Sequence, residues 1–371
     1  MTAVGSDEAR MLRDSAATFC ATEFPMDQVR RMADGPGGIT PAAWQALAAQ
    51  GWLAILIPES QGGLGLGITE LAMVLEQLGR ALVPGPFLSA AALGVPAIAA
   101  SPNGALRARW LEPISSGAKR VTLALLEDAR LPADDALAVR AEPTGSSRYR
   151  LTGTKRLVPD LAGADAIAVV TGTGTGPRIF LVDAEAPGVT VEENRVVDAT
   201  SRYGTLDLAS VEVSDDHLLG DGELLARLLA FANVGIAAMA VGGARAVFDQ
   251  VTSYVKQRTQ FGVPIGTFQA VQHPLADLFG EIESAESAYR YAAWAVDHRG
   301  DDLPQAVALA RLASTAAYRK AGTTSLQAHG GIAFTWEYDL HLHLKRALHL
   351  CWLLGGPADY EEIIARNALE I

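Results

Sequence analysis

Residues 258–269 of this 371-residue chain read RTQFGVPIGTFQ, and this stretch decides the fold of the C-terminal part. It ends one long helical pattern, turns at the Gly-Val-Pro that follows Phe261, and starts a second helical pattern. The glycine and the proline are sufficient for such a turn, so the turn itself does not require Arg258 or Phe261. An arginine at such a corner can form charge-assisted bonds to phosphate, and an aromatic side chain beside it can pack on a planar ring.

Long helical patterns lie on both sides of this corner. Apolar spacing predicts helices over residues 223–257, 268–299, 304–329 and 338–368, which would form a four-helix bundle within residues 221–371. The first of them contains residues 228–244, which are apolar except for Asn233. A spanning helix needs roughly 20 strongly apolar residues. Because this stretch is rich in Ala and Gly and continues into an amphipathic pattern, we predict a buried bundle helix and no membrane span.

The sequence pattern changes at Arg120, from helical apolar spacing to short apolar runs. Residues 1–118 read as an N-terminal α-helical domain, with apolar residues at spacings of three and four. Residues 119–220 contain short runs such as AIAVVTG and RIFLVDA between Gly, Pro and Asp clusters, which predicts a β-domain with an antiparallel, sandwich or barrel-like sheet. The order α, β, α lacks βαβ alternation and argues against a Rossmann sheet. The expected fold class is therefore α+β, with several domains.

Composition narrows the function further. The chain has 30 Lys and Arg against 42 Asp and Glu, a net charge of −12, which argues against nucleic acid as a partner. Its two cysteines, Cys20 and Cys351, are far apart, which excludes a disulfide scaffold and a thiolate zinc site and fits a reducing cytoplasm. The N-terminus shows no secretory signal pattern. His341 and His343 are two apart on a predicted helix and point in different directions, so we predict no metal site.

A second stretch, QAHGG at residues 327–331, follows the third predicted helix. Gly-Gly after a helix is first of all a C-terminal cap, although exposed backbone there could also approach a ligand. In combination, RTQFGVPIGTFQAVQHPLAD, then QAHGG, then a helix with LHLKRA resemble the acyl-CoA dehydrogenase family. The α, β, α order and the IPESQGGLGLG turn at residues 57–67 are similar to that family too. The resemblance covers nearly the whole chain.

This resemblance implies an FAD-dependent enzyme, usually a tetramer, that dehydrogenates an acyl-CoA thioester and passes electrons to an electron-transferring flavoprotein. It implies that the flavin ring lies against the β-domain of one subunit, while a neighbouring subunit holds the ADP portion. The residues of this chain that match the ADP-side contacts are Arg258, Gln260, Phe261, Phe268, Gln269, Gln327, Gly330 and Gly331.

The catalytic base that the resemblance implies is missing. The usual base is the Glu of a Tyr-Glu-Gly-Thr segment that follows an Arg-Asp-Ala stretch. With residues 345–347 placed on that stretch without a gap, Leu354 stands at the Glu. Some members place the Glu on the first bundle helix instead, and that position is Ala232. Because neither side chain can accept a proton, the pattern identifies no catalytic residue in this chain.

Flavin-side contacts depart from the family pattern as well. Leu126, Leu157 and Pro159 stand where the resemblance implies polar contacts to the flavin ring. The polar contacts are therefore lost on the flavin-ring half of the site, while the residues that match the ADP-side contacts remain. This asymmetry predicts a subunit that lends the ADP side to a paralogous catalytic chain, similar to the deficient subunits of actinobacterial α2β2 dehydrogenases of sterol side-chain thioesters. A self-sufficient homotetramer with an unidentified base, or a flavin-free non-enzymatic paralogue, remain alternatives.

Overall fold

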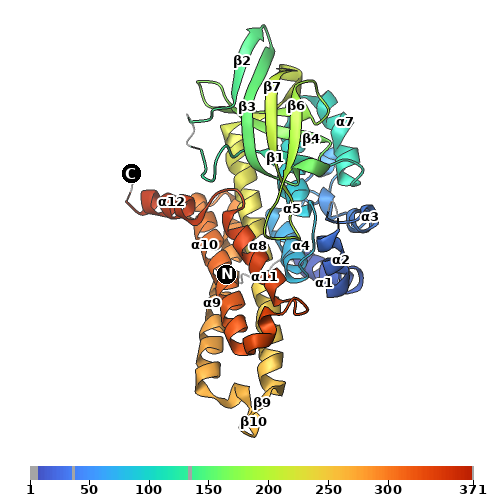
Figure 1. Ribbon diagram of the computed structural model, residues 1–371. Coiled ribbons are helices and arrows are strands. Elements are labelled where there is room, and N and C mark those ends of the chain that lie inside the picture. Colours follow the sequence, from blue (N-terminus) through green and yellow to red (C-terminus); the bar gives the residue numbers. More distant parts are fainter. Residues whose placement is uncertain (1–6, 36–37, 133–135, 370–371) are drawn as a thin grey trace.

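The computed structural model describes residues 7–35, 38–132 and 136–369. A sheet occupies one end of the molecule, and the long C-terminal helices run away from it (Figure 1). The N-terminal helices pack beside the middle of those long helices. The arrangement therefore contains the expected helical N-terminal part, β-domain and C-terminal helical bundle.

The N-terminal helices begin at residues that favour helix starts. Thr40 Oγ1 accepts the Ala43 amide at 3.2 Å, and Asn103 Oδ1 accepts the Ala105 amide at 2.9 Å, so both side chains act as N-caps. The helices are α1 (Asp7–Glu23), α2 (Met26–Asp34), α3 (Pro41–Ala48), α4 (Ile68–Arg80), α5 (Phe87–Ser89), a π-helical turn (Ala90–Gly94), α6 (Val95–Ala100) and α7 (Gly104–Ser115).

The sheet has eight strands and is mixed rather than antiparallel throughout. Strand β4 pairs in parallel with β1 and, at one residue pair, with β2. The β2–β3 hairpin lies between β1 and β4 in the chain, and this long connection leaves room for a parallel pair. The strands are β1 (Val121–Ala124), β2 (Arg140–Gly145), β3 (Arg148–Pro159), β4 (Ala166–Gly172), β5 (Pro177–Asp183), β6 (Val189–Asn194), β7 (Tyr203–Ser214) and β8 (Leu218–Asp221).

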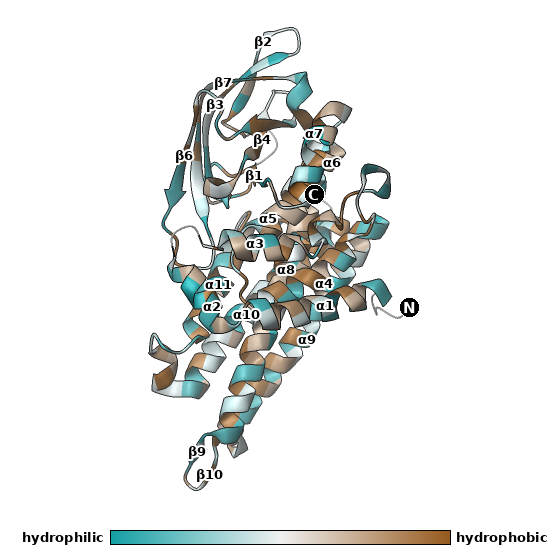
Figure 2. Ribbon diagram, turned by 90° about the vertical axis from the view of Figure 1, so that its right-hand side faces the viewer, coloured by the Kyte–Doolittle hydropathy of each residue, from teal (hydrophilic) through white to brown (hydrophobic). Residues whose placement is uncertain are grey.

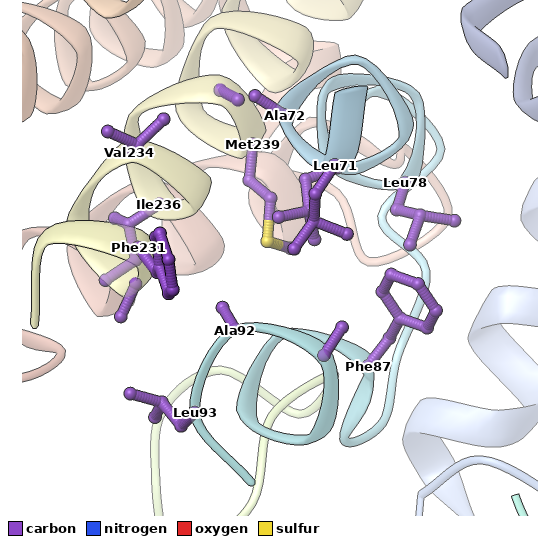
Figure 3. Packing of buried hydrophobic residues seen from close by; sticks show 14 of the residues in the cluster. Leu71, Ala72, Leu78, Phe87, Ala92, Leu93, Phe231, Val234, Ile236 and Met239 are labelled. Carbon is purple, nitrogen blue, oxygen red and sulfur yellow. The ribbon is translucent and has the colours of Figure 1, made fainter. Parts of the chain in front are cut away.

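The C-terminal part is built around α8 (Gly222–Gln257), which is followed by α9 (Gln269–His298) and α10 (Leu303–His329). Among the described residues α8 is the one helix long and apolar enough to cross a membrane, but 78% of its most apolar window is buried inside the fold. Met239 of α8 lies next to Leu71 of α4 in the apolar core (Figure 3). The predicted buried bundle helix is therefore present.

The helix predicted over residues 338–368 is wrong in one respect, because it is two helices, α11 (Leu340–Trp352) and α12 (Pro357–Leu369). The chain breaks between them at Leu354 and Gly355, whose φ angles are 58° and 109°. These left-handed conformations cannot continue an α-helix, and Pro357 suits the first turn of a new one. Tyr360 Oη donates to the Leu354 carbonyl at 2.6 Å and holds the break in place.

Close packing of α4 on α8 depends on glycines. A Cβ built on Gly242 would lie 1.9 Å from the Glu76 carbonyl oxygen, whereas one on Gly280, in α9, would meet nothing within 4 Å. We expect Gly242→Ala to lower the free energy of unfolding by about 1–3 kcal/mol through overpacking. Gly280→Ala, the matched control, should raise it by up to about 1 kcal/mol. Urea denaturation of both variants tests this, and equal effects would contradict the proposed contact.

Candidate functional site

The corner at residues 258–269 forms the far tip of the molecule, away from the sheet (Figure 1). After α8 the chain makes a hairpin of β9 (Thr259–Gln260) and β10 (Val263–Pro264), then a 3-10 turn (Ile265–Thr267), and enters α9. Phe261 and Gly262 have φ angles of 53° and 81° and form the hairpin turn. A phenylalanine in this conformation is uncommon, so the turn places its ring outward at some conformational cost.

The side chains of this tip are turned to solvent. Phe261 is 91% exposed and Phe268 is 38% exposed, and their ring centroids lie 6.2 Å apart in an edge-on arrangement. Arg258, Gln260 and Gln269 are exposed as well. Within the described ranges, no carboxylate forms an ion pair with Arg258, so its guanidinium is available to an external anion.

The second predicted patch lies beside the tip. Gln327, Gly330 and Gly331 are exposed where α10 ends, and a Cβ on either glycine would meet only open space. Tyr254 and His329, which the sequence did not single out as site residues, connect the two patches. Tyr254 lies one helical turn before Arg258, and its ring stacks on the His329 ring with the centroids 4.2 Å apart. The fold therefore brings all eight ADP-side candidates to one end of the bundle.

Leu354 lies elsewhere, in a small cavity of about 40 Å³ between the sheet and the helices. The cavity is lined by side chains from both, including Ser89, Pro159, Asp160, Arg346, His349 and Leu354. One water needs roughly 10–15 Å³, so the cavity has room for a few waters. It does not fit the ring system of a flavin.

An ion pair between the sheet domain and α11 lies beside this cavity, whose lining includes Arg346. Arg346 Nε donates to Asp198 Oδ2 at 2.7 Å, and Arg346 Nη2 donates to the Thr200 carbonyl at 3.0 Å. Arg346 and Asp198 are 3% and 2% exposed. Burial alone would raise the pKa of Asp198, but the charge of Arg346 and the hydroxyls of Thr200 and Ser201 hold this pKa well below its usual range. We call this pair the interdomain clamp.

Asp160 is the carboxylate among the residues that line the cavity. It accepts a hydrogen bond from Ser89 Oγ at 2.6 Å. Burial raises its pKa to about 6, against the lowering effects of Ser89 and of Arg346, Arg120 and Arg202. The carboxyl is therefore part of the same cavity lining as the side chain that replaces the expected base.

This raised pKa gives a testable pH dependence. Because folding raises the pKa of Asp160 to about 6, the stability that this group contributes is complete below pH ~4 and is lost as pH rises through about 6. We expect Asp160→Asn to exceed the wild type in free energy of unfolding by about 1–3 kcal/mol at pH 8, and to match it near pH 4. Urea denaturation at both values tests this; a less stable variant at pH 8 would show that the carboxylate is a required counter-ion.

The remaining candidates lie apart from both regions. Ala232 is fully buried in α8, and Asn233 Nδ2 donates to the Leu229 carbonyl at 2.8 Å. Leu126 is buried, and Leu157 is 36% exposed with a φ of 51°. His343 is buried with its Nδ1 2.8 Å from Tyr318 Oη. The described ranges contain no group of three His, Cys, Asp or Glu side chains that could hold a metal ion.

Comparison with known proteins agrees with this architecture. The acyl-CoA dehydrogenase C-terminal domain matches residues 221–369, and the acyl-CoA dehydrogenase N-terminal domain matches residues 6–118. The chain belongs to the acyl-CoA dehydrogenase family, whose members are FAD-dependent oxidoreductases.

Particular relatives narrow the comparison. The chain is 30% identical over 357 residues to acyl-CoA dehydrogenase IpdE2 of Mycolicibacterium smegmatis. This alignment covers 95% of this chain and 96% of the relative. It superposes with a TM-score of 0.92 and 28% identity on a chain of the ChsE4-ChsE5 complex from Mycobacterium tuberculosis, and each chain is covered completely. A chain of the Tcur3481-Tcur3483 steroid acyl-CoA dehydrogenase gives a TM-score of 0.89 at 30% identity, with 98% of each chain covered.

Proposed function

We propose that this chain is the base-lacking subunit of a hetero-oligomeric acyl-CoA dehydrogenase. It lends the ADP side of an FAD site to a paralogous chain, which supplies the flavin-ring contacts and the catalytic glutamate. The assembly is an α2β2 heterotetramer in the cytoplasm. It dehydrogenates a fatty-acyl or sterol side-chain CoA thioester in β-oxidation and passes electrons to an electron-transferring flavoprotein.

One contrast carries this proposal. The eight ADP-side candidates are exposed at one end of the bundle, while the cavity around Leu354 measures about 40 Å³. A chain that held a flavin ring against its own β-domain would need a larger space than this cavity provides. One similar structure is a ChsE4-ChsE5 complex, and the other carries a paired name, Tcur3481-Tcur3483, which supports a paralogous partner.

The exposed tip fits the nucleotide portion of FAD, and each residue has a defined task there. The Arg258 guanidinium would bind the pyrophosphate through charge-assisted bonds. The Phe261 and Phe268 rings would cover apolar parts of the nucleotide, and the open backbone at Gly330 and Gly331 permits close approach. The bound FAD would supply the hydride acceptor, next to the partner's glutamate.

The two alternatives make different demands on this chain. A self-sufficient homotetramer needs a base, and Asp160 is the carboxylate beside Leu354, but its cavity is too small for an acyl group. A flavin-free paralogue has no use for an exposed arginine and two exposed phenylalanines at the matched positions. Both alternatives are therefore less well supported than the shared site.

Mixing the chains tests the proposed function. The purified chain alone should give no dehydrogenation of acyl-CoA thioesters with an artificial electron acceptor. Addition of the paralogue that carries the glutamate should give turnover that saturates at a one-to-one ratio. Full turnover by the single chain would refute the proposal.

A variant separates the missing base from the missing flavin pocket. We expect Leu354→Glu to stay inactive when tested alone, because the cavity around residue 354 has no room for a flavin or an acyl group. Activity of this variant alone would mean that only the base was lost.

A further inference from the structure

The small cavity beside Leu354 lies where three elements of the fold meet. In both Figure 1 and Figure 2 the sheet lies above α5 and α11, and residues of all three line the cavity. Its volume of about 40 Å³ equals the space of a few waters, since one water needs roughly 10–15 Å³. A ligand in this cavity is therefore restricted to a few atoms.

One guanidinium nitrogen on the cavity wall has no partner in the described part of the chain. Arg346, which lines the cavity, donates through Nε to Asp198 at 2.7 Å and through Nη2 to the Thr200 carbonyl at 3.0 Å. Among the described residues, none accepts a hydrogen bond from Nη1 of Arg346. Because Arg346 is 3% exposed, bulk water reaches this nitrogen poorly. It is therefore a donor that a ligand inside the cavity would satisfy.

Arg311 adds a second guanidinium directly behind the cavity wall. Its Nη2 donates to the carbonyl of Leu353 at 2.7 Å, and Leu353 lines the cavity. Its Nη1 is buried, and within residues 7–35, 38–132 and 136–369 it has neither a hydrogen-bond partner nor a carboxylate in an ion pair. The side chain is 1% exposed, and this burial lowers the pKa of Arg311. Because an unpaired buried charge is costly, a negative charge nearby would stabilise the fold.

The positive charges around the cavity exceed the negative ones. Arg346 is paired with Asp198, and Arg202, which also lines the cavity, is paired with Glu193 at 3.3 Å. Asp160 is the carboxyl of the lining, and burial raises its pKa to about 6. At pH 5.5 this carboxyl is largely protonated, so it leaves the charge of the guanidinium behind the wall uncompensated. A protonated carboxyl can also donate a hydrogen bond to an anion.

We propose that this cavity binds one small monovalent anion, of the size of chloride or formate, between Arg346 and the Asp160 carboxyl and close to the charge of Arg311. The anion supplies the negative charge that the surrounding side chains lack. It binds only the folded chain, so it stabilises the junction of the sheet with α5 and α11. The inference is independent of the proposed function, because the cavity lies apart from the ADP-side tip and does not fit a flavin ring.

Bromide is the probe, because it is a small monovalent anion and its anomalous scattering locates it in a crystal. The full-length chain at pH 5.5 is titrated with sodium bromide, and sodium gluconate keeps the ionic strength constant. We expect the melting temperature to rise by about 3 °C or more at about 100 mM bromide and then to approach saturation. Formate should act in the same way, whereas propionate, which is too large for the cavity, should have no effect.

Two variants remove the charge and the space separately. Arg311→Met removes the buried guanidinium, and Leu93→Phe fills the cavity, which Leu93 lines, while it keeps every charge. We expect each to raise the dissociation constant for bromide by about tenfold or more. Arg148→Met is the matched control, because Arg148 is exposed on β3, and it should leave the dissociation constant unchanged.

Asp160 gives the binding a pH dependence. The charges that act on it are those of Arg120, Arg202 and Arg346. Tyr203 and His349 stay neutral, because burial raises the pKa of the phenol and lowers that of the imidazole to about 4, and Asp198 stays ionised beside its arginine. Above pH ~6 the Asp160 carboxylate repels an anion, so the dissociation constant for bromide should be about tenfold higher at pH 8 than at pH 5.5. Asp160→Asn should remove this difference.

A crystal structure at pH 5.5 in bromide decides the location of the anion. The proposal predicts an anomalous peak inside the cavity, beside Arg346. A cavity that holds only water at the same bromide concentration overturns the proposal. An equal effect of bromide on Arg311→Met and Arg148→Met would be a general salt effect and overturns it too, as does an effect of propionate as large as that of formate.

Discussion

Replacing Arg346 with alanine is expected to lower the free energy of unfolding of the isolated chain by about 3–5 kcal/mol. The physical reason is the buried partner: Asp198 is 2% exposed and, without the guanidinium at 2.7 Å, must either stay charged without its ion-pair partner or take up a proton, and both cost free energy. The interdomain clamp holds α11 against the sheet domain. We therefore expect the variant to unfold at a clearly lower urea concentration, measured by circular dichroism at pH 7.

An exposed ion pair serves as the control. Lys320 pairs with Glu281 at the surface, with 41% and 46% of the side chains exposed, so Lys320→Ala should cost no more than about 1 kcal/mol. Replacing both clamp residues with apolar ones, Arg346→Met with Asp198→Leu, should recover most of the lost stability. A loss below about 1 kcal/mol for Arg346→Ala would show that the clamp does not hold the domains together.

Arg258→Ala is expected to weaken FAD binding by the mixed complex on the order of 100-fold, because the proposed charge-assisted bonds to the pyrophosphate would be lost. Arg258→Lys should retain part of the affinity, since an ammonium keeps the charge but not the paired geometry of the guanidinium. Fluorescence titration of the flavin-depleted complex measures both effects. The isolated chain should keep its stability, because Arg258 is exposed at the tip.

Arg150→Ala is the matched control, because Arg150 is exposed on β3 at the opposite end of the molecule (Figure 1). Its substitution should leave the flavin affinity unchanged. Wild-type FAD affinity in Arg258→Ala would contradict the assignment of the tip to the ADP portion.

Helical periodicity predicted three of the long C-terminal helices to within a residue or two, because their apolar faces repeat at helical spacing. The break between α11 and α12 could not be predicted in the same way. Leu353 and Leu354 favour a helix as isolated residues, and the left-handed φ of Leu354 depends on tertiary contacts such as the Tyr360 hydrogen bond.

The candidate site likewise has one part that the sequence predicts and other parts that depend on contacts between distant residues. The tip is a local feature, and a short continuous motif was enough to predict its turn. The small cavity around Leu354 lies beside the ion pair of Arg346 and Asp198, which are 148 positions apart in the chain and meet only in the fold. The contact of Tyr254 with His329 joins positions 75 apart and was likewise not visible in the sequence.

We infer that this chain contributes one half of a shared FAD site and holds no flavin by itself. The most direct test is the flavin content per chain, measured by absorbance after denaturation, for the chain alone and for its purified complex with the paralogue. The account predicts a colourless single chain and about one FAD per two chains in the complex. A yellow single chain with about one FAD per chain would contradict it, because the cavity around Leu354 would then have to open for a flavin.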